Sequence, residues 1–178
     1  MSINGVPAGR VPADGLEALY HDCRICPRNC GVDRLEGERG VCGESAGVRV
    51  AWAGLHLGEE PPLTGGSGSG TIFFSGCTLK CGSCQNSQIS HEAMGRGMSR
   101  AELSGMMVRL QERGAANVNL VTASHFAPSV IASVTAARTQ GLSIPVVWNS
   151  SGYETKATLK LLRDTVDVYL PDCKTLDG

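Results

Sequence analysis

From residue 71 onward, short apolar runs alternate with longer segments whose apolar residues recur at helical spacing. The apolar runs are predicted to be four strands, at residues 71–75, 117–122, 144–149 and 166–172. The segments between them are predicted to be three helices, at residues 98–114, 128–141 and 154–165. Strands joined through helices form right-handed crossovers and give a parallel sheet covered by helices. The fold class is therefore α/β.

The first predicted helix has the clearest boundaries. Ser99 followed by Glu102 forms a capping box at its start, and Gly114 marks its end. One face of this helix carries the apolar residues Leu103, Met106, Met107 and Leu110. We expect this face to pack on the sheet.

The part of the chain before the first predicted strand lacks this alternation of strands and helices. Residues 1–20 are predicted to be a loose leader, and residues 48–60 alternate enough to be a hairpin or an edge strand. PPLTGGSGSG at residues 61–70 has the composition of a linker. We therefore expect two parts, a leader with a cysteine-rich module at 1–60 and an α/β core at 61–178.

Composition narrows the function classes. The 178 residues suit one domain, and 16 Lys and Arg residues against 17 Asp and Glu residues give no basic excess for nucleic acid or an anionic membrane. The first twenty residues have no signal-peptide pattern, and no stretch approaches the roughly 18 apolar residues of a membrane span. A cytoplasmic location is the expectation. In that compartment, eight cysteines favour metal binding or chemistry over disulfides.

Cys77, Cys81 and Cys84 follow the first predicted strand, with three and then two residues between them. A [4Fe–4S] cluster normally takes four thiolates, so three thiolates leave one iron open to a substrate or cofactor. Ligand-binding groups gather at the carboxyl ends of parallel strands, where these cysteines are expected to lie. The alternatives are a zinc site completed by a remote ligand such as His91, or buried cysteines without a metal.

This C-x3-C-x2-C motif after the first strand of a βα array resembles the signature of the radical S-adenosylmethionine (SAM) superfamily. The resemblance extends over residues 20–178. Within the superfamily, the sequence is similar to the subgroup that resembles pyruvate formate-lyase activating enzyme. The segments that carry it are CRICPRNCGVDRLEGERGVCG, GEEPPLTGGSGSGTIFFSGCTLKCGSCQN, WNSSGYE and YLPDCK. The resemblance implies a partial (β/α) barrel.

The resemblance also implies a reaction. SAM would bind the open iron of the [4Fe–4S] cluster, and its reductive cleavage would give a 5′-deoxyadenosyl radical that abstracts a hydrogen atom. The implied partners are a low-potential electron donor, such as flavodoxin or ferredoxin, and a glycyl radical enzyme that the chain would activate. The alternatives are a radical SAM maturase or small-molecule enzyme of other specificity, or an iron–sulfur electron carrier without SAM chemistry. Polar residues at the strand ends argue against a carrier, which does not require them.

The later strand ends supply the other candidate residues. By resemblance, Ser124 would contact the SAM amino group, and Asn149 and Ser151 would lie near its ribose or carboxylate. Asp172 and Lys174 would lie near SAM and the substrate. The alternatives are a helix cap for Ser124, a turn at residues 149–151, and a simple salt bridge between Asp172 and Lys174.

Three neighbouring residues are not expected to be ligands. Side chains alternate across a strand, so Cys173 is expected to point away from Asp172 and Lys174 and to pack against the helices. His125 is interpreted as a hydrogen-bonded structural histidine. Ser83 stands where much of the superfamily has an aromatic residue that helps to hold adenine, so that contact is in doubt.

A second cysteine set precedes the core. Cys23, Cys26, Cys30 and Cys42 lie within twenty residues and supply four thiolates, which is a complete set for structural zinc or for a second [4Fe–4S] cluster. Disulfides are the alternative. His21 is a conceivable extra ligand but is more in keeping with a solvated residue.

The resemblance implies a core of about six βα units, and this sequence supplies four predicted strands. We therefore expect a barrel truncated after its fourth strand, with inefficient turnover by the chain as given. The edge of that strand is expected to expose apolar residues at Val166, Val168 and Leu170.

Overall fold

A computed structural model describes residues 13–174, and a six-stranded sheet in the order β3-β1-β2-β4-β5-β6 runs through it. The strands are β1 (Val48–His56), β2 (Ser69–Phe74), β3 (Arg96–Met98), β4 (Val118–Val121), β5 (Val146–Ser150) and β6 (Val168–Pro171). β2, β4, β5 and β6 are parallel to one another, as predicted. β1 is antiparallel to both of its neighbours, so the α/β fold has a mixed sheet.

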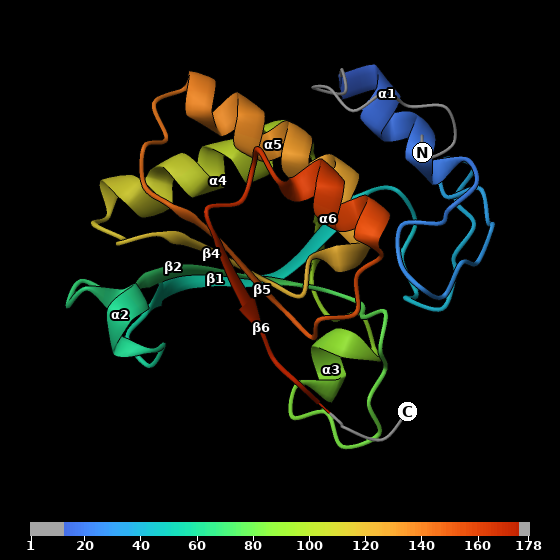
Figure 1. The fold of residues 1–178 in the computed structure, drawn as a ribbon, viewed down its shortest axis with the longest axis horizontal. Helices are drawn as coiled ribbons and strands as arrows, with labels where there is room; N and C mark the ends of the chain where they lie inside the picture. Colours follow the sequence, from blue (N-terminus) through green and yellow to red (C-terminus); the bar gives the residue numbers. More distant parts are fainter. Residues whose placement is uncertain (1–12, 175–178) are drawn as a thin grey trace.

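Three helices connect the parallel strands and lie on one side of the sheet (Figure 1). They are α4 (Arg100–Glu112), α5 (Ala127–Thr139) and α6 (Lys156–Leu162), and all three were predicted. The shorter helices are α1 (Ala13–Glu17), η1 (Ala18–Tyr20), α2 (Pro61–Thr64), α3 (Ser87–Ser90) and η2 (Ser124–Phe126). No helix within residues 13–174 is long and apolar enough to span a membrane.

The predicted capping box at the start of α4 is confirmed. The Ser99 hydroxyl accepts the Glu102 N–H at 3.2 Å, and the Glu102 carboxylate accepts the Ser99 N–H at 2.7 Å. Two helix-end donors are thereby satisfied, which fixes where the helix begins.

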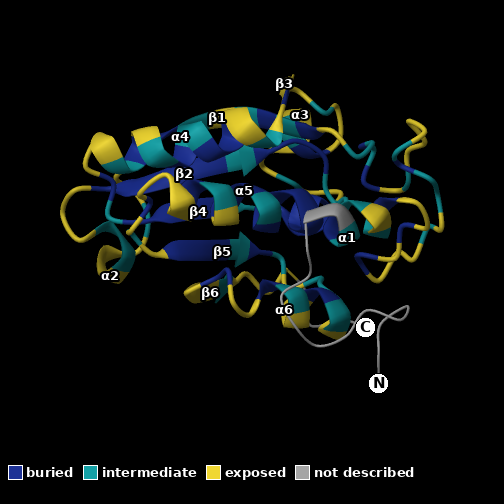
Figure 2. Ribbon diagram, turned by 90° about the horizontal axis from the view of Figure 1, so that it is seen from above, coloured by how far each residue is buried: buried dark blue, intermediate teal, exposed yellow. Residues whose placement is uncertain are grey.

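The main core lies between the sheet and these helices. Ile72, Leu120 and Val146 project from β2, β4 and β5, and they are fully buried with Leu103 and Met107 of α4. Figure 2 shows β2, β4 and β5 buried along most of their length, whereas the outer faces of α4 and α5 are exposed. Helices therefore cover one face of the sheet. The candidate ligands Cys77, Cys81 and Cys84 lie in a loop that follows a strand.

The prediction for residues 48–60 is wrong in its placement. β1 is neither a hairpin nor an edge strand, because it pairs with β2 on one side and with the short β3, which was not predicted, on the other. Residues 61–70 are also not a plain linker, since they contain α2 and the start of β2. The sheet therefore extends across the boundary that was predicted between residues 60 and 61.

The loose leader predicted for residues 1–20 is wrong for residues 13–20, which are helical; residues 1–12 lie outside the described residues. Leu16 and Tyr20 are buried in the core, and the Tyr20 hydroxyl is 3.0 Å from the Ser129 hydroxyl of α5. Apolar burial with a satisfied hydroxyl anchors this segment.

Among the described strands, β3 and β6 are the edges of an open sheet. Val168 and its neighbour Tyr169 in β6 are exposed, as expected for that edge, whereas Leu170 is half-buried and Val166 is buried. The barrel stays a prediction.

Candidate metal centre

The loop that follows β2 carries Cys77, Cys81 and Cys84, all of them partly exposed. The loop returns through α3, and two contacts close it: the Gly76 N–H donates to the Ile89 carbonyl at 2.9 Å, and Lys80 Nζ donates to the Ser90 carbonyl at 2.6 Å. Because β2 ends at Phe74 and is parallel to β4, the predicted position of these cysteines after the carboxyl end of the first parallel strand is confirmed.

Two of the three sulfur atoms receive hydrogen bonds. The Leu79 N–H donates to Cys77 Sγ at 3.4 Å, and the Ser90 hydroxyl donates to Cys84 Sγ at 3.3 Å. Hydrogen bonds to the sulfur atoms of its ligands tune the potential of an iron–sulfur cluster. The loop therefore offers contacts of the kind that surround cluster ligands.

Within residues 13–174, no group of three or more His, Cys, Asp or Glu side chains is arranged so that it could hold a single metal ion. A [4Fe–4S] cluster is held differently, with one thiolate on each liganded iron, so its cysteines stand farther apart than the ligands of one ion. His91, the candidate extra ligand for zinc, has its Nδ1 2.8 Å from the Ser90 hydroxyl.

The end of β6 lies at the three-cysteine loop. Asp172 and Lys174 form the ion pair that was predicted as the simple alternative, and both are exposed. The bond to Asp172 is the main cause of a raised Lys174 pKa, and the charges of Cys81 and Cys84 add to it. Cys173 is exposed, so its predicted packing against the helices is wrong.

The ends of β4 and β5 meet at the same edge of the sheet. Thr122 has a left-handed backbone with φ 54°, which is unusual for a β-branched residue, and its N–H donates to the Asn149 carbonyl at 2.8 Å. Ser151 Oγ is buried without a partner in the described structure. A buried hydroxyl without a partner and a strained backbone are features that occur at binding sites.

The hydroxyl of Ser124 is already engaged in a hydrogen bond. Its buried hydroxyl donates to Glu154, whose carboxylate also accepts the Trp148 indole N–H at 3.1 Å. The alternative role of Ser124 as a helix cap is wrong, since the residues that cap η2 and α5 are Ala123 and Phe126. The sequence could not reveal the bond to Glu154, because the two residues are far apart in the chain.

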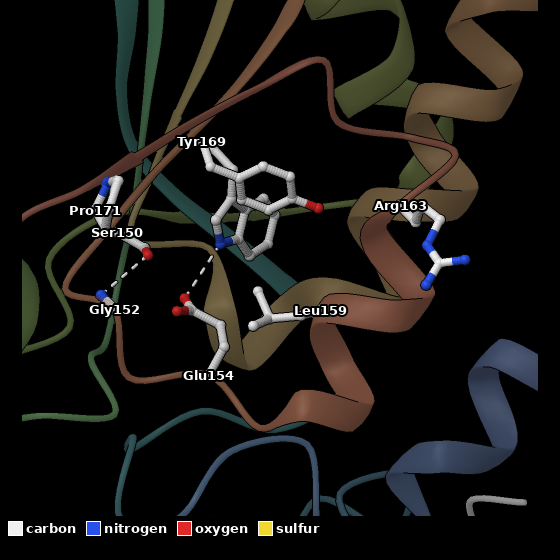
Figure 3. A pocket seen from close by; sticks show the side chains of 8 residues that line it. Ser150, Gly152, Glu154, Leu159, Arg163, Tyr169 and Pro171 are labelled. Atoms are coloured by element: carbon white, nitrogen blue, oxygen red, sulfur yellow. Dashed lines mark hydrogen bonds between the residues drawn. The ribbon is translucent and has the colours of Figure 1, made fainter.

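Glu154 and Trp148 belong to a pocket of about 510 Å³ between α6 and the last two strands (Figure 3). Figure 3 shows Glu154 with Leu159 beside it and Arg163 farther from it. The pocket is lined by Trp148, Ser150, Gly152, Glu154, Leu159, Arg163, Tyr169 and Pro171, so it includes none of the cysteines.

A polar contact on the other side of the sheet was not singled out from the sequence. Asn119 is fully buried in β4, and its amide N–H donates to the Glu59 carboxylate at 2.5 Å. Burial is the main cause of a raised Glu59 pKa, and the neighbouring Glu60 adds to it. An asparagine within an apolar strand and the stretch GEEPP were the available signals.

His125 is a structural histidine, as interpreted from the sequence. It is fully buried, and its Nε2 donates to the Ser75 carbonyl at 2.7 Å, two residues before Cys77. Burial, together with the nearby charge of Arg34, lowers the pKa of His125 to about 3. His125 is therefore neutral and ties the end of β4 to the end of β2.

We expect His125 to make the fold acid-sensitive. An unfolded histidine has a pKa of about 6.5, so below that pH the unfolded chain binds a proton that the folded chain does not. The stability present above this pH is lost progressively as the pH falls from about 6.5 towards about 3. Between pH 6.5 and 5 we expect a loss of roughly 2 kcal/mol in the free energy of unfolding, measured by urea titration.

The variant His125→Gln keeps a side-chain N–H for the Ser75 carbonyl but does not titrate. It is expected to lose this part of the pH dependence. Equal slopes of unfolding free energy against pH in the variant and the wild type would contradict the assignment.

Comparison with known proteins assigns the chain to a family. Residues 64–174 match the family described as the 4Fe-4S single cluster domain. An uncharacterized protein of Methanocaldococcus jannaschii is 33% identical over 162 residues, which are 88% of this chain and 46% of that protein. The chain thus spans about half the length of this relative. No solved structure matches. Because the family match covers more than half of the residues, including all three cysteines after β2, the chain belongs to the 4Fe-4S single cluster domain family and is an iron–sulfur protein.

Proposed function

We propose that the chain is a radical SAM protein and that Cys77, Cys81 and Cys84 hold its [4Fe–4S] cluster with one iron left open. The observation that carries this proposal is the position of three partly exposed cysteines, two with hydrogen bonds to sulfur, directly after the first parallel strand. Family membership supports the cluster itself. The resemblance of the cysteine spacing supports its use with SAM.

The residues around the loop fit a bound cluster and SAM. When bound, these cofactors would supply reductive cleavage of a carbon–sulfur bond and a 5′-deoxyadenosyl radical. Lys174, close enough to be affected by Cys81 and Cys84, would supply positive charge beside the thiolates. The buried hydroxyl of Ser151 and the side chain of Asn149 would donate hydrogen bonds to SAM. Asp172 would accept from its amino or hydroxyl groups.

Ser124 has a different role in this proposal. Since its hydroxyl donates to Glu154, it would act as a positioning residue that holds the β4 and β5 ends together. It would not contact SAM directly.

We further propose the finer assignments that rest on resemblance. The chain would be similar to pyruvate formate-lyase activating enzyme, would receive electrons from a flavodoxin or ferredoxin in the cytoplasm, and would activate a glycyl radical enzyme. Residues 61–178 would form, together with β1, the core of a partial (β/α) barrel, with the cysteine-rich module in the part of residues 1–60 before β1. The segments quoted above and the four parallel strands support these assignments.

The test is anaerobic reconstitution of the chain with iron and sulfide, followed by reduction with and without SAM. A radical SAM protein is expected to change the paramagnetic resonance spectrum of its reduced cluster when SAM binds, and to release 5′-deoxyadenosine. An electron carrier would show a reducible cluster with neither effect, and that outcome would overturn the proposal.

A further inference from the structure

The four cysteines at positions 23, 26, 30 and 42, here called the cysteine module, lie close together in a segment whose shape does not come from helices or strands. Cys23, Cys26 and Cys42 are buried, and the backbone pairs Cys23 with Val32 at 3.1 Å. The Gly31 N–H donates to the Cys23 carbonyl at 3.0 Å, and the Asn29 N–H donates to the Cys26 carbonyl at 3.0 Å. These backbone bonds fold the segment back on itself and bring its cysteines near one another.

The backbone of residues 40 and 41 closely surrounds the sulfur atom of Cys30. The Val41 N–H donates to Cys30 Sγ at 3.4 Å. A Cβ at Gly40 would stand only 2.8 Å from the same sulfur, so glycine is required for the backbone to pass. Close backbone approach with an N–H aimed at sulfur is typical of cysteine ligands in iron–sulfur proteins.

Arg34 is buried in the middle of the module. Only 1% of it is exposed, and its guanidinium donates to the carbonyls of His125 and Ser45, each at 2.6 Å. It lies 4.5 Å from the centre of the Tyr20 ring and 3.7 Å from Cys23 Sγ. Within residues 13–174, no carboxylate comes within ion-pair distance of it.

This burial requires a negative charge nearby. A guanidinium is not deprotonated in proteins, and a buried charge without a counter-charge is strongly destabilising. Carbonyl oxygens and aromatic faces stabilise it only in part. The thiol of Cys23 lies 3.7 Å from the guanidinium, and metal-bound cysteines are thiolates.

We propose that Cys23, Cys26, Cys30 and Cys42 hold a second metal centre through four thiolates, with Arg34 as its buried counter-ion. Four thiolates around a [4Fe–4S] cluster carry a net negative charge, which the guanidinium would offset. The proposal is for a cluster rather than for zinc, because no three of these side chains within residues 13–174 are arranged around a single ion. The centre lies outside residues 64–174, to which the family match is confined.

The second centre would lie next to the loop that holds the first cluster. The Cys77 N–H donates to the Cys42 carbonyl at 3.4 Å, which joins one ligand of each site through the backbone. Arg28, also within the module, donates to the carbonyls of Thr78 and Leu79 at 2.8 and 2.9 Å. A metal in the module would thus hold the loop of the first cluster in place.

The test isolates the module in the full chain. A variant with Cys77, Cys81 and Cys84 all replaced by alanine retains only the module cysteines and Cys173 as thiols, and it is expected to keep bound metal. Adding Cys26→Ser to this variant is expected to remove that metal. Zinc, iron and sulfide are then counted per chain, which distinguishes a zinc site from a cluster.

Arg34→Met then tests the counter-ion, with Arg39→Met as the matched control, because Arg39 is an exposed arginine of the same segment. Loss of metal to a competing chelator is expected to occur at about 10- to 100-fold lower chelator concentration in Arg34→Met, with Arg34→Lys closer to wild type and Arg39→Met unchanged. If Arg34→Met does not fold, Arg34→Gln takes its place, since it keeps N–H donors for the two carbonyls but removes the charge.

Two results would overturn the proposal: a triple-alanine variant without metal, or metal retention by Arg34→Met that equals that of Arg39→Met. Neither result depends on SAM cleavage. The proposed function can therefore fail while the second centre stands, and the second centre can fail while the function stands.

Discussion

Replacing Cys81 with alanine is expected to abolish the cluster after β2 and with it all SAM cleavage. Only two thiolates would remain in this loop, and a [4Fe–4S] cluster held by two protein ligands is not retained. The visible absorption of the cluster and the release of 5′-deoxyadenosine from the reduced protein are the measurements. Both are expected to fall to background, while any metal in the cysteine module stays bound.

The control is Cys173→Ala, which removes an exposed cysteine that our proposal does not use as a ligand. It is expected to keep full iron content and full SAM cleavage. A Cys81→Ala protein that cleaves SAM at the wild-type rate would refute the ligand assignment.

Replacing Gly76 with alanine is expected to destabilise the fold strongly. Gly76 adopts φ 77°, where an L side chain is strained by about 1–2 kcal/mol. Its Cβ would lie 2.7 Å from the Cys42 carbonyl oxygen, 2.7 Å from Glu44 Cγ and 3.2 Å from His125 Nε2. Glu44 is buried, so it has little room to move.

We expect a total cost of about 3 kcal/mol or more for Gly76→Ala, since overpacking adds to the backbone strain. This cost corresponds to a thermal midpoint lowered by roughly 6–12 °C. Because the substitution pushes apart the Cys42 and Cys77 backbones, the variant is also expected to bind less iron. Calorimetry and iron counts on the reconstituted protein measure the two effects.

Gly82 provides the matched control in the same loop. A Cβ at Gly82 would meet nothing within 4 Å, and its backbone is not left-handed. Gly82→Ala is therefore expected to behave as wild type. If both variants are equally stable, the close approach at Gly76 does not constrain the fold.

The local pattern of the sequence was sufficient for the parallel part of the fold. β2, β4, β5 and β6 form where short apolar runs occur, and α4 begins at Ser99 because its capping box satisfies donors within one turn. The spacing of Cys77, Cys81 and Cys84 likewise put three sulfurs in one loop at a strand end. These features depend on residues that are close in sequence, so they can be predicted from it.

The position of β1 could not be predicted in this way. Whether an alternating segment is an edge or an inner strand depends on which backbone groups approach it from both sides. Here β3 lies on one side of β1 and β2 on the other, and β3 is too short to give a periodic signal. The helical residues 13–20 are a similar case, because their order comes from packing on α5.

The contacts that link the two cysteine sets were decided only by the tertiary structure. Arg34 reaches the carbonyl of His125 across 91 residues, and His125 in turn holds Ser75 at the end of β2. Spacing alone identified the thiols as candidate ligands but could not show that a buried guanidinium contacts the Cys23 sulfur. A charged side chain is ordinarily expected at the surface, and it becomes informative only when its burial and its partners are known.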